Sequence, residues 1–120
     1  WKQGNHLRLF WNNCKSIIEN SIKEGFDVVF NYVLDKEQIK DIKQNFPFCE
    51  IKFVCSMVDE ATIVQRDKLR PIDCQMGERS LILLQEMKDE NFSDDNILDT
   101  SHLTIEQSYM EILNNNRFII

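Results

Sequence analysis

The sequence predicts an α/β fold, in which a parallel sheet lies between helices on both faces to give three layers. Amphipathic helical stretches alternate with short apolar stretches along the chain, which is typical of strands joined by crossover helices. The two longer apolar stretches carry apolar residues on both faces, as the strands of a buried parallel sheet do. Residues typical of helix N-termini follow the apolar stretches, so each strand is expected to lead into a helix.

The first half of the chain predicts two helices separated by a strand. Apolar residues recur at three- and four-residue spacing over about residues 6–24, which indicates an amphipathic helix. The stretch 26–34 is apolar on both faces and predicts a buried, parallel-type strand. Asp35 and Gln38 then form a capping-box pattern, so a second helix is expected to begin there and to end at Pro47.

The middle of the chain predicts a second strand and two helices. Residues 51–58 form the strand, and Asp59 is placed to cap a helix that runs to about Leu69. An arginine-rich segment of about 66–79 contains a proline and a glycine, which indicate a break between helices. Helical spacing resumes over about residues 77–88.

The end of the chain predicts a short third strand over 96–99 and a final helix. Thr104 and Gln107 form a second capping-box pattern, and the helix is expected to run to about Asn114. Residues 117–120 are expected to dock as a tail. A sheet of three parallel strands is small, so partner strands from outside this chain are expected.

Length and charge limit the class of protein. A chain of 120 residues predicts one domain over 1–120. The net charge of −6 disfavours a nucleic-acid partner and an anionic membrane surface. No apolar run approaches the length of a membrane span. The irregular cysteine spacing and the absence of a secretion signal lead us to expect a cytoplasmic protein.

The cysteines favour a reducing compartment. They are spaced irregularly, and no CxxC occurs. This pattern predicts free thiols rather than disulfides. It also lacks zinc-ligand spacing with either histidine, so no metal site is expected. The cysteines are Cys14, Cys49, Cys55 and Cys74.

The arginine-rich segment is the strongest functional signal, because the chain is otherwise acidic. It carries Arg66, Arg70 and Arg79 between two helical stretches. The guanidinium group is well suited to bidentate contact with phosphate, and a mobile arginine-bearing segment is what a phosphoryl-transfer lid needs. The alternative is that these arginines make ordinary surface ion pairs. The acids nearby are Asp67, Asp73 and Glu78.

Two further groups of polar residues stand near predicted strand ends. Asn31 and Tyr32 lie near the carboxyl end of the first strand, where open parallel sheets bind ligands. A hydrogen-bonded asparagine inside the strand is the alternative for Asn31. Residues 99–102 follow the third strand, and their alternative is a helix-entry turn with His102 on the surface.

Three stretches together resemble the C-terminal part of P-loop kinases, closest to the small-molecule kinases related to chloramphenicol phosphotransferase and shikimate kinase. The element order along nearly the whole chain is also similar. The stretches are Gly25 to Val33, then Met57 to Glu60 with the lid-like Gln65 to Pro71 and Met76 to Arg79, and last Leu98 to Glu106.

The resemblance implies a function and a set of site residues. It implies ATP and Mg²⁺ as cofactors and a small-molecule hydroxyl as the acceptor. Arg70 and Arg79 would stabilise the transferring phosphoryl group, and Asn31 and Tyr32 would face the substrate. The residues implied to bind the nucleotide are Arg66, Arg70, Arg79, Thr100 and Ser101.

The sequence departs from that family in one respect. It contains only three glycines, Gly4, Gly25 and Gly77, and no GxxxxGK[ST] loop to hold phosphates. The chain would therefore be the lid-and-sheet portion of a kinase and inactive by itself. The rival hypothesis is a non-catalytic α/β binding or assembly module. Such a module would form a homo-oligomer through an open sheet edge.

Overall fold

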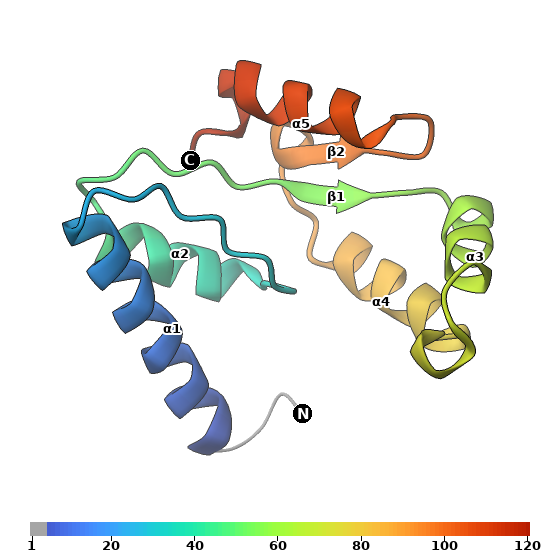
Figure 1. Cartoon of the computed structure of the whole chain (residues 1–120), viewed down its shortest axis with the longest axis horizontal. Coiled ribbons are helices and arrows are strands. Elements are labelled where there is room, and N and C mark those ends of the chain that lie inside the picture. Colours follow the sequence, from blue (N-terminus) through green and yellow to red (C-terminus); the bar gives the residue numbers. More distant parts are fainter. Residues whose placement is uncertain (1–4) are drawn as a thin grey trace. The chain divides into compact units, whose positions relative to one another are not determined.

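The computed structural model describes residues 5–120, which form a mixed, helix-rich protein with a small parallel sheet. The chain divides into two compact units, Trp1–Cys49 and Glu50–Ile120. In its described part the first unit contains two helices and an irregular segment between them, and the second unit contains the sheet (Figure 1). No helix among residues 5–120 has both the length and the apolar character needed to cross a membrane.

The first unit consists of two helices and the segment that joins them. Helix α1 spans Asn5–Lys23 and helix α2 spans Lys36–Asn45. The predicted capping box is confirmed. The Gln38 backbone N–H donates to Asp35 Oδ1 at 2.9 Å, and the Asp35 backbone N–H donates to Gln38 Oε1 at 3.0 Å. This exchange fixes where α2 begins, because it satisfies two backbone donors at the first turn.

The predicted strand over 26–34 is wrong. The segment forms neither helix nor strand, and no β-bridge joins it to another part of the described chain. A strand needs a neighbouring backbone to pair with, and composition alone does not supply one. The segment is instead held by its aromatic side chains. The Tyr32 ring lies 5.2 Å from Phe10, and the Phe30 ring lies 6.0 Å from Trp11.

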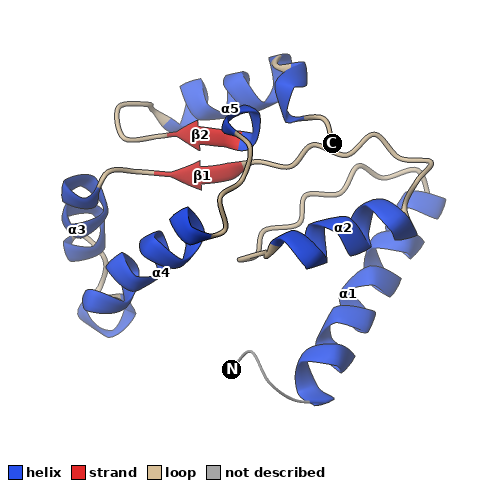
Figure 2. Cartoon of the chain, turned by 180° about the vertical axis from the view of Figure 1, so that it is seen from behind, coloured by secondary structure: helices blue, strands red, loops and turns tan. Residues whose placement is uncertain are grey.

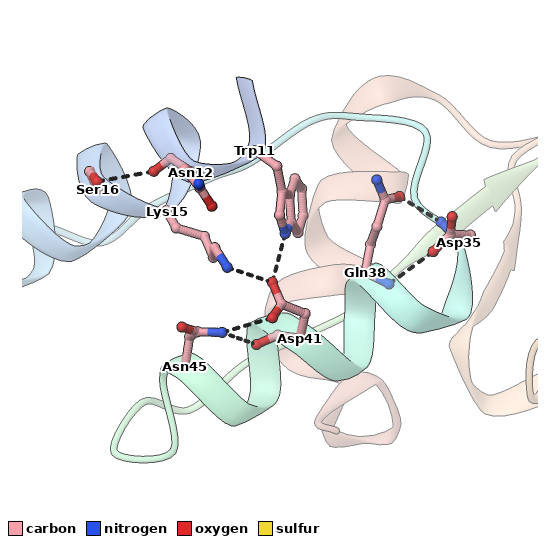
Figure 3. A network of polar contacts seen from close by, with 8 residues as sticks. All are labelled: Trp11, Asn12, Lys15, Ser16, Asp35, Gln38, Asp41 and Asn45. Carbon is pink, nitrogen blue, oxygen red and sulfur yellow. Dashed lines mark hydrogen bonds and ion pairs between the residues drawn. The ribbon is translucent and has the colours of Figure 1, made fainter. Parts of the chain in front are cut away.

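Asp41 joins the two helices of the first unit (Figure 3). Its Oδ2 atom accepts from Trp11 Nε1 at 2.6 Å and from Lys15 Nζ at 2.9 Å, both on α1. Its Oδ1 atom accepts from Asn45 Nδ2 at 3.0 Å within α2. The pKa of Asp41 lies below its ordinary value, chiefly because the Lys15 and Trp11 hydrogen bonds favour the charged form. We call this arrangement the Asp41 clasp.

The second unit is built on a pair of parallel strands. Strand β1 spans Cys55–Met57 and strand β2 spans Ile97–Asp99, with Cys55 opposite Ile97 (Figure 2). The predicted parallel pairing is therefore confirmed for two short strands. A crossover of two helices connects them, α3 over Glu60–Lys68 and α4 over Glu78–Asp89.

Helix α5, over Ile105–Asn114, follows β2 and begins at the predicted capping box. Gln107 N–H donates to Thr104 Oγ1 at 3.1 Å, and Thr104 N–H donates to Gln107 Oε1 at 2.8 Å. The last carbonyls of the helix are bound by Lys52, whose Nζ donates to Ile112 O and Leu113 O. Both ends of α5 are thus satisfied by side chains.

The core of the second unit lies beside the strands, and the predicted docked tail is confirmed. Phe118 is fully buried, and its carbonyl accepts from Phe53 N–H at 2.9 Å. The Arg117 guanidinium lies 4.3 Å from the Phe118 ring centroid, which adds a cation–π contact. Burial raises the pKa of the Cys55 thiol, so this cysteine acts as a small core hydrophobe. All four cysteines are free thiols.

Candidate functional site

The carboxyl ends of β1 and β2 form the best-organised polar region of the second unit. β1 ends at Met57 and β2 at Asp99, and the loop after β2 turns back onto β1. Thr100 donates to the Met57 carbonyl through its N–H at 2.8 Å and through its hydroxyl at 3.2 Å. Ser101 Oγ accepts from Asp59 N–H at 2.8 Å and donates to Asp99 Oδ1 at 2.6 Å. The ends of open parallel sheets are where ligands commonly bind.

Helix α3 brings Arg66 to this strand-end region. Asp59 caps the helix as predicted, since its side chain accepts from Thr62 N–H at 2.7 Å. Two turns later, Arg66 Nη2 donates to Thr100 O at 2.7 Å, and Nη1 lies 3.4 Å from Thr100 Oγ1. Arg66, Thr100 and Ser101, all predicted for nucleotide binding, therefore lie together although 34 residues separate Arg66 from Thr100.

Two carboxylates lie at the strand ends. The sequence predicts Asp59 only as a helix cap and Asp99 only as part of the polar loop 99–102, and neither as a residue that binds the nucleotide. The pKa of Asp59 lies below its ordinary value, mainly because Thr62 N–H and the Thr62 hydroxyl donate to the carboxylate. The pKa of Asp99 is also lowered, chiefly by the Ser101 hydroxyl and N–H. The nearby His102 favours the charged form of both. Their position in the sequence could have indicated a site role, because each aspartate stands at the end of a strand.

Arg70 lies just beyond the C-terminal end of α3, beside the buried carboxylate of Asp67. Asp67 accepts from Gly77 N–H at 2.8 Å and from Met76 N–H at 3.0 and 3.1 Å. The pKa of Asp67 is lowered, first by Met76 N–H and then by Gly77 N–H, with a smaller effect of Arg70. Arg70 Nη1 lies 3.5 Å from Asp67 Oδ1, so the two form an ion pair. The alternative partner proposed for Arg70 is thus the one observed.

Arg79 is paired along its own helix. Its Nη1 and Nη2 donate to the two carboxylate oxygens of Glu86 at 3.0 and 3.2 Å. Glu86 is two turns further along α4 and was not among the acids considered from the sequence. Each of the three arginines therefore has a different partner: Thr100 for Arg66, Asp67 for Arg70 and Glu86 for Arg79.

The predicted substrate residues lie in the first unit. Asn31 is exposed, and the Tyr32 ring stacks near Phe10 and Phe30. The sequence pattern predicts a substrate role for both only through their place near the carboxyl end of a strand. Since residues 26–34 form no strand, that reason no longer applies to either of them.

Neither a protein-family model nor a curated protein matches this chain. The described residues, 5–120, contain no group of three or more histidine, cysteine or acidic side chains arranged to hold a metal ion. The class that the geometry defines is a mixed α/β protein with a polar site at the ends of two parallel strands.

Proposed function

We propose that this chain is the lid-and-sheet portion of an ATP-dependent small-molecule phosphotransferase of the cytoplasm. In this proposal a phosphate-bearing ligand binds at the strand ends. One observation carries it: the Arg66 guanidinium lies on the loop after β2, at the carboxyl ends of two parallel strands. A cation at this edge of an α/β sheet is well suited to a nucleotide or another phosphate ester.

The hydrogen bonding of Arg66 leaves it able to take an anion. Its acceptors, the Thr100 carbonyl and hydroxyl, are uncharged. A phosphate oxygen is a stronger acceptor than either, since it carries negative charge and two such oxygens can accept from one guanidinium in a bidentate pair. The exposed side chain needs no rearrangement of the core to exchange partners.

The two aspartates at the strand ends bear on the form of the ligand. Asp59 and Asp99 are held as carboxylates by their hydrogen bonds, so they oppose a bare polyphosphate. A magnesium complex of ATP carries less negative charge and would meet less repulsion. Arg70 and Arg79 would stabilise charge on the transferring phosphoryl group. We assign no general base, and without a GxxxxGK[ST] loop we expect no ATP turnover by this chain alone.

Titration of Mg-ATP into the purified chain at low salt, followed by calorimetry, tests the proposal. We expect measurable binding that Arg66→Ala weakens by roughly 10- to 150-fold, because one charge-assisted hydrogen bond contributes about 1.5–3 kcal/mol. Lys68→Ala is the matched control, since it removes one exposed positive charge from the same helix. Equal weakening by both substitutions would indicate a general charge effect. Absence of binding in the wild-type chain would contradict the site.

A second candidate is a non-catalytic assembly module that forms a homo-oligomer, and an apolar face on α5 favours it. Four large apolar side chains, more than half exposed, recur along one side of the helix at spacings of one to four residues. They are Ile105, Tyr109, Met110 and Leu113. Sedimentation of the wild-type chain and of Met110→Glu over a range of concentrations tests this candidate. Association that the substitution abolishes would support it, and a monomer at every concentration would contradict it.

A further inference from the structure

The connection between α3 and α4, residues 69–77, is bound at both of its ends. At its start, Gln75 Nε2 donates to the carbonyls of Lys68 and Arg70, at 3.3 and 3.0 Å. The Lys68 carbonyl is one that the end of α3 leaves without a helical partner, and the Arg70 carbonyl lies just beyond the helix. At its other end, Asp67 accepts the N–H groups of Met76 and Gly77. The side chains of Gln75 and Asp67 thus bind backbone groups at the end of α3, inside the connection and at Gly77, which precedes α4.

Asp67 is well placed for this role. Asp67 is 7% exposed, which is one of the lowest exposed fractions among the charged residues of the described chain. Its carboxylate lies at the N-terminus of α4, where the helix dipole favours a negative charge. Gly77 has φ +56° and ψ −132°, a conformation open to glycine, and this turns its N–H toward the carboxylate. Ser80 then fixes the glycine from the helix side by donating to the Gly77 carbonyl at 2.7 Å.

The same carboxylate orients an arginine. The backbone N–H groups of Met76 and Gly77, just before α4, lie 2.8–3.1 Å from the Asp67 carboxylate, whereas Arg70 Nη1 lies 3.5 Å away. Because the backbone contacts are shorter, they determine the position of the carboxylate, and the Arg70 guanidinium is oriented by its ion pair with that carboxylate. The Arg70 side chain remains 52% exposed and can contact a ligand from this position.

We propose that Asp67 is a positioning residue, which clasps α3, the connection and α4 into one body that carries Arg70 and Arg79 at a fixed spacing. The predicted lid would then move as a rigid helical hairpin rather than as a flexible loop. The role proposed here for Asp67 in ligand binding rests on the phosphate-binding function proposed above. A rigid hairpin loses less conformational entropy when two arginines engage one ligand, so clasping raises affinity without touching the ligand.

We call the hydrogen bonds from Met76 N–H and Gly77 N–H to the Asp67 carboxylate the Asp67 clasp. Amide hydrogen exchange of the full chain, followed by NMR, tests it. Asp67→Ala is expected to speed exchange at Met76 and Gly77 by roughly tenfold or more, because both lose a charged acceptor. Asp67→Asn keeps a carbonyl oxygen in place and is expected to give a smaller change. Asp73→Asn is the matched control, since it neutralises an exposed acid in the same connection. Exchange in Asp67→Ala within about twofold of wild type would overturn the proposal.

Mg-ATP affinity tests whether the clasp positions Arg70. If Asp67 acts through Arg70, the loss of affinity in Asp67→Ala with Arg70→Ala will equal the loss in Arg70→Ala alone. Full additivity of the two losses, or unchanged affinity in Asp67→Ala, would overturn the positioning role. If the wild-type chain binds no Mg-ATP, the proposed function fails together with this role, and the exchange experiment alone decides whether the clasp exists.

Discussion

Asp41 and Asp67 each join two helices, one in each unit, but they do so with different kinds of partner. Asp41 is held by the side chains of Trp11, Lys15 and Asn45. Asp67 is held by the backbone N–H groups of Met76 and Gly77. The Asp41 clasp therefore depends on which residues α1 carries. The Asp67 clasp depends on a backbone conformation and tolerates most side chains, apart from the one that replaces Gly77.

Substitution of Gly77 should lower the free energy of unfolding the most, because it strains the backbone conformation on which the Asp67 clasp depends. A side chain at φ +56° and ψ −132° is strained, although a Cβ there meets no atom within 4 Å. We expect Gly77→Ala to lower the free energy of unfolding by about 2–3 kcal/mol. Urea denaturation followed by circular dichroism measures this loss.

Gly25→Asn is the comparison for Gly77→Ala. Gly25 also has positive φ, at +82°, just after α1, where asparagine is the residue that best replaces glycine. We expect a loss below about 1 kcal/mol there. Similar losses at the two glycines would show that positive φ alone matters and that the Asp67 clasp adds no special demand on Gly77.

Removal of the carboxylate from the Asp41 clasp should have a smaller effect. Asp41→Ala removes the acceptor shared by Trp11 and Lys15, but the side chain is 36% exposed and water replaces part of the loss. We expect about 1–2 kcal/mol of destabilisation by urea denaturation, near the lower end for charged hydrogen bonds. Lys40→Ala, an exposed change on the same helix, is the control and should be nearly neutral. Equal losses of stability in Asp41→Ala and Lys40→Ala would contradict a stabilising role of the Asp41 clasp.

The sequence predicted the parts of this fold that short-range signals determine. The capping residues Asp35, Asp59 and Thr104 each contact the backbone three residues ahead, so their pattern is complete within one helical turn. The absence of a strand over 26–34 could not be predicted from such short-range signals. Whether an apolar segment becomes a strand depends on a partner backbone, and no β-bridge joins it to another described segment.

The candidate site was only partly predictable, because its residues could be recognised one by one but their contacts depend on long-range pairing. Arg66 and Thr100 were each selected, but their contact joins positions 34 residues apart, and only the parallel pairing of β1 with β2 brings them together. The pairing of Arg79 with Glu86 spans two turns of α4 and was missed. The Asp67 clasp was missed as well, since it closes a turn whose shape depends on Gly77.

The smallest expected effect is that of Lys15→Met, and the pKa values of Asp41 and Asp67 are the quantities that compare the two clasps. Lys15 is the first cause of the lowered pKa of Asp41, whereas Met76 N–H is the first cause for Asp67. Lys15→Met should therefore raise the pKa of Asp41 toward its ordinary value and leave that of Asp67 unchanged. NMR titration of the two carboxyl carbons measures both. A shift of both pKa values would contradict separate clasps.

The stability of the Lys15→Met variant should follow the same titration. A carboxyl with a lowered pKa contributes stability above its unfolded pKa, near 3.8, and this contribution is lost as the pH falls through the lower folded value. We expect Lys15→Met to cost about 0.5–1 kcal/mol at neutral pH, as for a partly exposed ion pair. The difference from wild type should shrink below about pH 4 as Asp41 is protonated. A difference that stays constant down to pH 2 would mean that Lys15 stabilises α1 by packing rather than by its charge.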